Sequence, residues 1–105
     1  EDDAVLGADF CPRLRASLAA LRDEDPSWDL LHVGYYDDDC SLQALASQGE
    51  AARLLCRPVQ IFGLFGAALR PRGARALLEH LFPLEEQIDS ALAGVYGAVR
   101  AYAVR

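Results

Sequence analysis

The stretch FCPRLRASLAALRDEDPSWDLLHVG, residues 10–34, predicts a helix followed by a buried strand. Apolar residues in its first half recur at steps of four, four and three, which is the spacing of one helix face. They are Phe10, Leu14, Leu18 and Leu21, and they predict a helix over residues 10–22. Asp9 precedes this helix, where its carboxylate can accept hydrogen bonds from the first-turn N–H groups. Residues 28–33 form a short apolar run typical of a strand covered on both faces, and Gly34 should end it.

The segments on either side extend this pattern to an α/β layout. Residues 1–5 predict the tail of a strand before the first helix. After residue 34 we expect, in order, an acidic loop over 35–40, a short helix over 41–53, one or two strands over 58–69 with a bend at Gly63 or Gly66, helices opened by Pro71 and Pro83, and a strand within 95–104. Leu84, Ile88 and Leu92 predict the apolar stripe of the last helix. The sequence therefore predicts an α/β fold with a mixed sheet flanked by helices.

The composition limits the kinds of partner. The chain has 105 residues, 52% of them hydrophobic, so it can bury a packed core. Its net charge of −6 disfavours nucleic acid as the main partner, because acidic surfaces repel phosphate backbones. A nucleotide ligand is still compatible with this charge, since a divalent cation can bridge carboxylates and phosphates. No apolar run reaches the length that a bilayer requires, so we expect no membrane span.

Three leading carboxylates, Glu1-Asp2-Asp3, form the first candidate site. Such a cluster is most often only solvated. Here it precedes a capped amphipathic helix, which would put it at a strand-to-helix junction, where open α/β sheets bind ligands. Carboxylates at that position can hold Mg²⁺ or Mn²⁺ and so neutralise a diphosphate leaving group.

Several segments, in the right order, resemble glycosyltransferase family 25, the family of the bacterial lipooligosaccharide and the procollagen galactosyltransferases. The central block is EDDAVLGADFCPRLRASLAAL at 1–21 with WDLLHVG at 28–34. The later segments are FGAALRPRGA at 65–74, QIDS at 87–90 and VRAYAV at 99–104. The chain departs from the family at two positions: Ala67 stands where a Tyr is common, and Arg70 stands where a Ser is common.

The resemblance implies a GT-A fold, which is Rossmann-like, with residues 1–105 as one partial domain. This part would be the C-terminal, acceptor-side half, and the nucleotide-binding half would lie upstream. The chain contains no Met and opens inside an acidic cluster, which fits that expectation. The implied reaction transfers a hexose such as galactose from a UDP-sugar donor to a glycan or hydroxylated-protein acceptor. It would be inverting and would require Mn²⁺ (or Mg²⁺).

The resemblance also implies roles for single residues. Glu1, Asp2 and Asp3 would bind the donor, with Glu1 and Asp3 holding the metal. Asp89, within Gln87-Ile88-Asp89-Ser90, would be the catalytic base that takes the acceptor proton or a group that binds the acceptor. The alternative interpretation is that Asp89 is an exposed carboxylate on a helix without a functional role.

Four further residues are candidates for acceptor binding: Tyr35, Asp37, Phe65 and Gln87. Tyr35 and its neighbour Tyr36 could stack on a sugar ring, although adjacent tyrosines at a strand end are more often packing residues. The acidic loop at Asp37 follows a strand and could border the acceptor, or it could be a solvated loop.

Other chemistries have weaker signals. His32 has no partner at metal-ligand spacing and is expected to be a hydrogen-bonded core residue. The three cysteines have no zinc spacing, and no serine lies in a nucleophile-elbow pattern. The competing class to an enzyme is a degenerate transferase-like domain that binds a glycan or a protein. Metal-dependent UDP release would separate the two.

Overall fold

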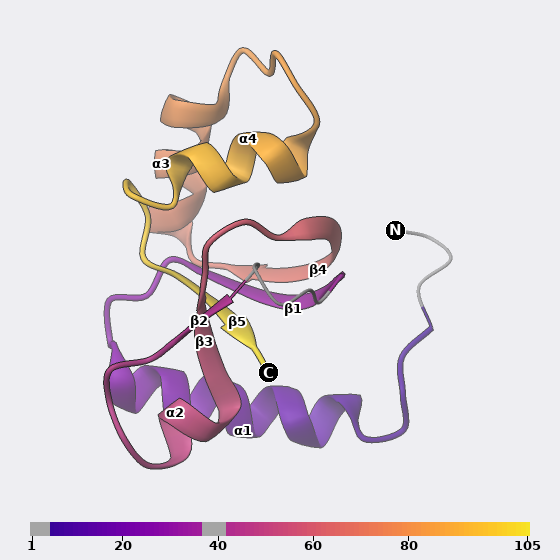
Figure 1. Ribbon diagram of the computed structural model, residues 1–105, viewed down its shortest axis with the longest axis vertical. Coiled ribbons are helices and arrows are strands. Elements are labelled where there is room, and N and C mark those ends of the chain that lie inside the picture. Colours follow the sequence, from indigo (N-terminus) through magenta and orange to yellow (C-terminus); the bar gives the residue numbers. More distant parts are fainter. Residues whose placement is uncertain (1–4, 37–41) are drawn as a thin grey trace.

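Helices and strands are interspersed along the described part of the chain, which comprises residues 5–36 and 42–105 of the computed structural model. The elements are α1 (Phe10–Glu24), β1 (Leu30–Tyr36), β2 (Leu42–Ala44), α2 (Glu50–Leu54), β3 (Leu55–Pro58), β4 (Phe62–Leu69), α3 (Pro71–Leu81), α4 (Ile88–Val95) and β5 (Ala101–Val104). The strands form one sheet in the order β2-β3-β5-β1-β4 (Figure 1). β1 and β5 run parallel, and the other neighbours pair antiparallel. The predicted α/β class with a mixed sheet is confirmed.

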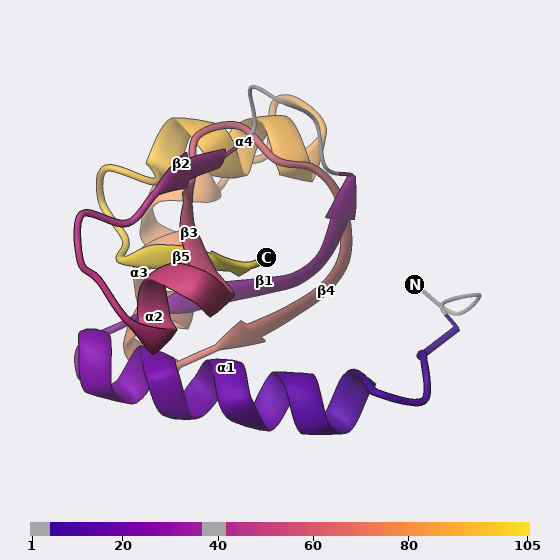
Figure 2. The ribbon, with the colours of Figure 1, turned by 60° about the horizontal axis from the view of Figure 1, so that its bottom comes forward.

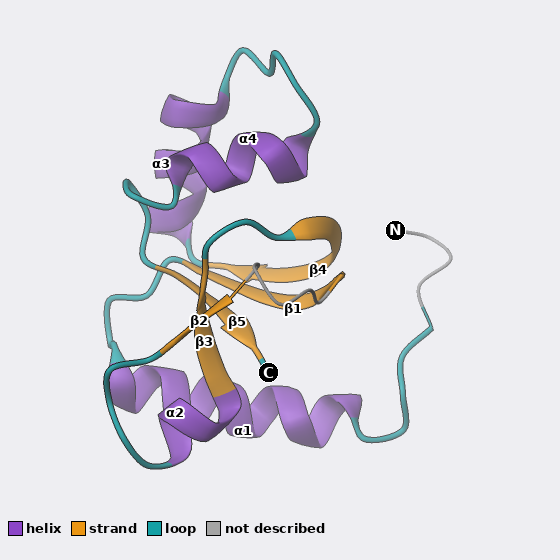
Figure 3. Ribbon diagram, in the orientation of Figure 1, coloured by secondary structure: helices purple, strands orange, loops and turns teal. Residues whose placement is uncertain are grey.

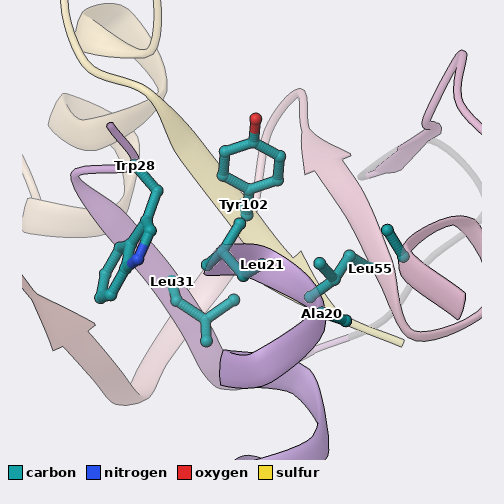
Figure 4. Close-up of a cluster of buried hydrophobic side chains, with 7 residues drawn as sticks. Ala20, Leu21, Trp28, Leu31, Leu55 and Tyr102 are labelled. Atoms are coloured by element: carbon teal, nitrogen blue, oxygen red, sulfur yellow. The ribbon is translucent and has the colours of Figure 1, made fainter. Parts of the chain in front are cut away.

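Helices cover both faces of the sheet, with α1 and α2 on one side and α3 and α4 on the other (Figure 3). The first face buries a cluster that includes Leu21 of α1, Leu31 of β1 and Tyr102 of β5 (Figure 4). The opposite face buries Leu30 of β1 against Leu92 of α4 and other apolar residues. Alternate residues of β1 therefore enter two different cores, which explains why the strand opens with two adjacent leucines.

The first helix follows the predicted apolar stripe and begins at Phe10 as predicted, but its N-terminal cap differs from the prediction. Leu14 and Leu18 pack against the buried cluster around Leu21. Asp9 makes no side-chain capping hydrogen bond; its carboxylate instead lies 3.8 Å from the Arg13 guanidinium. The cap prediction was wrong because Asp9 has helical backbone angles, which turn its side chain away from the first-turn N–H groups.

Four other local predictions need correction. Val5 is 95% exposed and belongs to no strand, so the predicted strand tail does not reach it. Gly34 does not end β1, which continues to Tyr36. Residues 42–58 form β2, α2 and β3 rather than a single short helix. Pro83 opens no helix, because α4 begins only at Ile88.

The stripe predicted for the last helix is only partly buried. Leu92 lies in the core at 3% exposure. Leu84 and Ile88 stay exposed, because residues 82–87 form a loop and the helix presents only its later turns to the sheet.

A network of ion pairs, with buried carboxylates and partly exposed arginines, joins the amino-terminal ends of β1 and β5 to α3. Asp25 and Asp29, just before β1, are each 4% exposed. Asp29 accepts hydrogen bonds from the Arg72 guanidinium at 2.9 and 3.0 Å and from the Arg100 backbone N–H at 2.9 Å. Asp25 accepts from Arg100 Nε at 2.7 Å and from the Tyr102 hydroxyl at 2.8 Å. Burial alone would raise the pKa of Asp25, but these hydrogen bonds outweigh it and hold that pKa below its usual value.

The first turn of α3 lies directly against Asp29. A Cβ atom at Gly73 would stand 2.6 Å from the Asp29 carbonyl oxygen, and the Arg70 N–H donates to that oxygen at 3.0 Å. The segments WDLLHVG and RPRGA are therefore in direct contact.

No helix within residues 5–36 and 42–105 has the length and apolarity needed to cross a membrane, in agreement with the prediction.

Candidate functional site

The carboxyl-terminal ends of the parallel strands β1 and β5 border a pocket of about 390 Å³. Its wall includes Asp9, Phe10 and Arg13 from the start of α1, Gly34 and Tyr35 from β1, and Arg105 after β5. In Figure 2, α1 runs along the sheet in the direction opposite to β1, so the start of α1 lies toward this end. In open α/β sheets this is the usual position for ligand binding.

The polar groups of the pocket carry both charges. Arg13 donates through Nη2 to the Arg105 carbonyl oxygen at 2.9 Å and lies near the Asp9 carboxylate. The Tyr35 hydroxyl donates to the Val104 carbonyl oxygen at 2.5 Å. Tyr35 therefore ties β1 to the end of β5, and its ring forms part of the pocket wall. A role for Tyr35 in acceptor binding stays a prediction.

Asp89 lies at the same end of the sheet but is held by another group of residues. Its Oδ2 accepts a hydrogen bond from the Gly63 N–H at 3.1 Å, and its Oδ1 accepts from the Ser90 N–H at 2.8 Å. Gly63 directly follows Phe62, which pairs with Tyr36 at the end of β1. The hydrogen bonds from Gly63 and Ser90 lower the pKa of Asp89. The carboxylate is thus ionised at neutral pH and fixed in position.

Two aromatic rings, of Tyr36 and Phe65, lie beside Gly63, the residue whose N–H binds the Asp89 carboxylate. Phe65 meets Tyr36 edge to face with ring centroids 4.7 Å apart. A Cβ atom at Gly63 would come within 2.6 Å of the Phe65 ring, and Gly63 has a φ of 77°, a conformation that suits glycine. Asp89, Gly63, Phe65 and Tyr36 therefore gather at the junction of β1 and β4, and Tyr36 is 66% exposed.

The remaining predicted site residues divide into two groups. Gln87 is exposed at the start of α4, where its carbonyl oxygen accepts the Ala91 N–H at 2.9 Å. Glu1, Asp2, Asp3 and Asp37 lie outside the described residues. The structure thus brings Asp89 and Phe65 together through Gly63, with Gln87 two positions before Asp89.

The metal prediction depends on the acidic motif alone. Within residues 5–36 and 42–105, no three His, Cys, Asp or Glu side chains are arranged to hold a metal ion. Asp9 is the one acidic side chain among the described residues of the pocket wall. The described residues by themselves therefore do not form a cation site.

One polar pair near the site was missed by sequence reasoning. His32 of β1 is 1% exposed, and its Nε2 lies 3.0 Å from the Tyr96 hydroxyl. Burial lowers the pKa of His32 to about 4. Burial and the charge of Asp89 together raise the pKa of Tyr96 to about 12. The expected hydrogen-bonded core role of His32 is confirmed. Tyr96 follows Asp89 by seven positions, two helical turns, and this spacing could have placed Tyr96 on the same helix face as Asp89, but no sequence signal connects Tyr96 with His32.

Comparisons with known proteins return no match: no family model, curated protein or solved structure matches this chain.

Proposed function

We propose that this chain is the acidic-motif and acceptor-side part of a glycosyltransferase that transfers a hexose, such as galactose, from a UDP-sugar to a glycan or hydroxylated-protein acceptor. One observation carries the proposal: two segments with carboxylates meet the same end of the sheet. Gly7 and Asp9, which follow the acidic motif, border the pocket at the carboxyl end of β1. Asp89 is hydrogen-bonded at that end as well.

The donor side of the proposed site combines the acidic motif with the pocket. Glu1, Asp2 and Asp3 would bind the sugar diphosphate, with Mn²⁺ or Mg²⁺ held by Glu1 and Asp3. The cation, when bound, neutralises charge on the diphosphate. Arg13 supports this assignment, because its guanidinium adds a positive charge to the pocket wall.

Asp89 is the proposed base on the acceptor side. An acceptor hydroxyl attacks the anomeric carbon in line, the bond from that carbon to UDP breaks, and the carboxylate takes the hydroxyl proton. The lowered pKa keeps Asp89 ionised, and each carboxylate oxygen retains a lone pair after its backbone hydrogen bond. The exposed Tyr36 ring beside Phe65 offers an apolar face to the acceptor sugar.

The test is release of UDP from UDP-galactose by the protein that carries this sequence, with and without Mn²⁺. We expect turnover only with the metal. Asp3→Asn should abolish metal-dependent donor binding. Asp89→Asn should retain UDP affinity and lower turnover by about 10²-fold or more, as for loss of a general base. Asp23→Asn, an exposed carboxylate on α1, is the matched control and should leave turnover unchanged.

A second candidate is a transferase-like domain that binds a glycan without turnover. The hydrogen bonding of Asp89 favours it, because Oδ2 already fixes α4 to Gly63 and Oδ1 already accepts the Ser90 N–H within the helix. Absence of UDP release from every nucleotide sugar, with glycan binding that Tyr36→Ala removes, would replace the enzyme by this binding function.

A further inference from the structure

The strand β4 forms an edge of the sheet. It lacks the charges and prolines that often protect such an edge, although its register against β1 shifts between His32 and Gly34 and between Gly34 and Tyr36. Among the described strands it pairs with β1 alone, as the outermost strand of the order (Figure 2). Its sequence FGLFGAAL contains no charged residue and no proline. Phe62 and Leu69 at its two ends are 40% and 44% exposed. Proteins normally protect long edge strands with Lys, Pro or a covering segment, because an open edge pairs with other chains.

The opposite edge differs. β2 has only three residues, Leu42–Ala44, so it offers a much shorter ladder to a partner. An added strand would therefore pair with β4.

Charges at the two ends of β4 favour one direction for an added strand. Arg70 is exposed directly after Leu69, at the strand's carboxyl end. Asp89 is hydrogen-bonded to Gly63 at the amino end. A second β4 laid antiparallel brings each Arg70 toward the other copy's Asp89, whereas a parallel copy brings like charges together. The strand between these ends is uncharged. Two antiparallel copies of β4 therefore place no like charges opposite each other along the strand, although each chain is acidic overall.

We propose that two copies of this chain associate through β4, antiparallel and related by a two-fold axis perpendicular to the sheet. This symmetry keeps the faces of the two sheets aligned. Even-numbered residues of one β4 therefore pair with even-numbered residues of the other, and odd with odd. The axis then passes at Phe65 or Gly66. Phe65 or its neighbours then contact their own equivalents at the centre. The pairing uses up the longer edge, so association stops at the dimer. This inference does not depend on the proposed transferase function.

The test is the mass in solution, over a concentration series, of the protein that carries this sequence, measured by sedimentation under reducing conditions because Cys11 is exposed. We expect the mass to double as concentration rises, without larger species. Ala67→Lys puts a charge on the exposed middle of β4 and should raise the dissociation constant about tenfold or more. Ala44→Lys makes the same change on the exposed β2 edge and should leave the dimer unchanged.

Isotope-filtered nuclear Overhauser contacts test the strand direction. Contacts between copies at Phe65 and Gly66, together with contacts from Phe62 to Ala68 or from Gly63 to Leu69, would support the antiparallel pairing. A chain that stays monomeric at all concentrations, an equal response to the two lysine variants, or contacts between the two copies of Phe62 would overturn it.

Discussion

At the residue scale, the burial of His32 makes the stability of the fold depend on pH. Its folded-state pKa of about 4 lies below the ordinary 6.5, so the unfolded chain takes up a proton that the folded chain refuses. Stability is therefore fully present above pH 6.5 and falls as the pH drops toward 4. The shift corresponds to about 3 kcal/mol at most.

The first prediction follows from this difference. The free energy of unfolding, measured with urea, should decrease from pH 6.5 to 4.5 in the native sequence. His32→Leu should flatten that decrease, while His80→Gln, at an exposed histidine, should keep it. Equal pH dependence in the native protein and His32→Leu would show that another group causes the loss.

Asp25 is the second residue with a clear energetic role. Asp25→Ala leaves the buried Tyr102 hydroxyl without its acceptor and separates Arg100 from its ion pair. We predict a loss of about 2–4 kcal/mol in the urea-derived free energy of unfolding. Asp23→Ala, two positions earlier and exposed, should change it by less than about 0.5 kcal/mol. Similar values for the two variants would contradict the network's role.

At the element scale, the fit between α3 and β1 depends on the missing side chain of Gly73. Gly73→Ala would force a Cβ atom against the Asp29 carbonyl and should destabilise the protein by about 1–3 kcal/mol. Gly94 provides the matched control, because a Cβ atom there meets nothing within 4 Å inside α4. Gly94→Ala should stabilise by about 0.5–1 kcal/mol. Thermal unfolding of both variants measures these changes in stability. If Gly73→Ala left the stability unchanged, α3 and β1 would not be in such close contact.

The elements also show which parts of the fold were predictable. α1, the core of β1 and α3 follow from the sequence, because each has a long apolar period or a proline in its first turn. β2 and β3 have only three and four residues, too few for a strand to show its alternation, whereas β5 lies within the strand predicted for 95–104. The loop before α4 was mistaken for helix, since Pro83 and the following acidic residues carry the same signals as a helix start.

Single residues of the candidate site could be predicted from the sequence, but the contacts between residues far apart in the sequence could not. Asp89 and Phe65 were named in advance, but the link between them, Gly63, was expected only as a bend. The ion pair between Asp25 and Arg100 spans most of the chain, and no local pattern reports such a contact. Tertiary packing decides these partners, and it leaves no trace in periodicity or spacing.

At the scale of the whole molecule, the two ends of the sheet have different roles. The amino-terminal ends of β1 and β5 are closed by the network of Asp25 and Asp29, whose carboxylates are buried and paired. The carboxyl-terminal ends border the pocket and lie near Asp89. This division agrees with the general arrangement of α/β proteins, in which one end of the sheet binds ligands.

The account predicts that a cation bound by Glu1 and Asp3 with a UDP-sugar lies at the carboxyl end of the sheet. Paramagnetic broadening by Mn²⁺ in the NMR spectrum of the labelled protein measures this most directly. With UDP-galactose present, the amide signals of Gly7, Gly34 and Ser90 should broaden, while that of Arg100 at the other end should stay sharp, and Asp3→Asn should remove the effect. Broadening centred on Arg100, or none with any nucleotide sugar, would contradict the account.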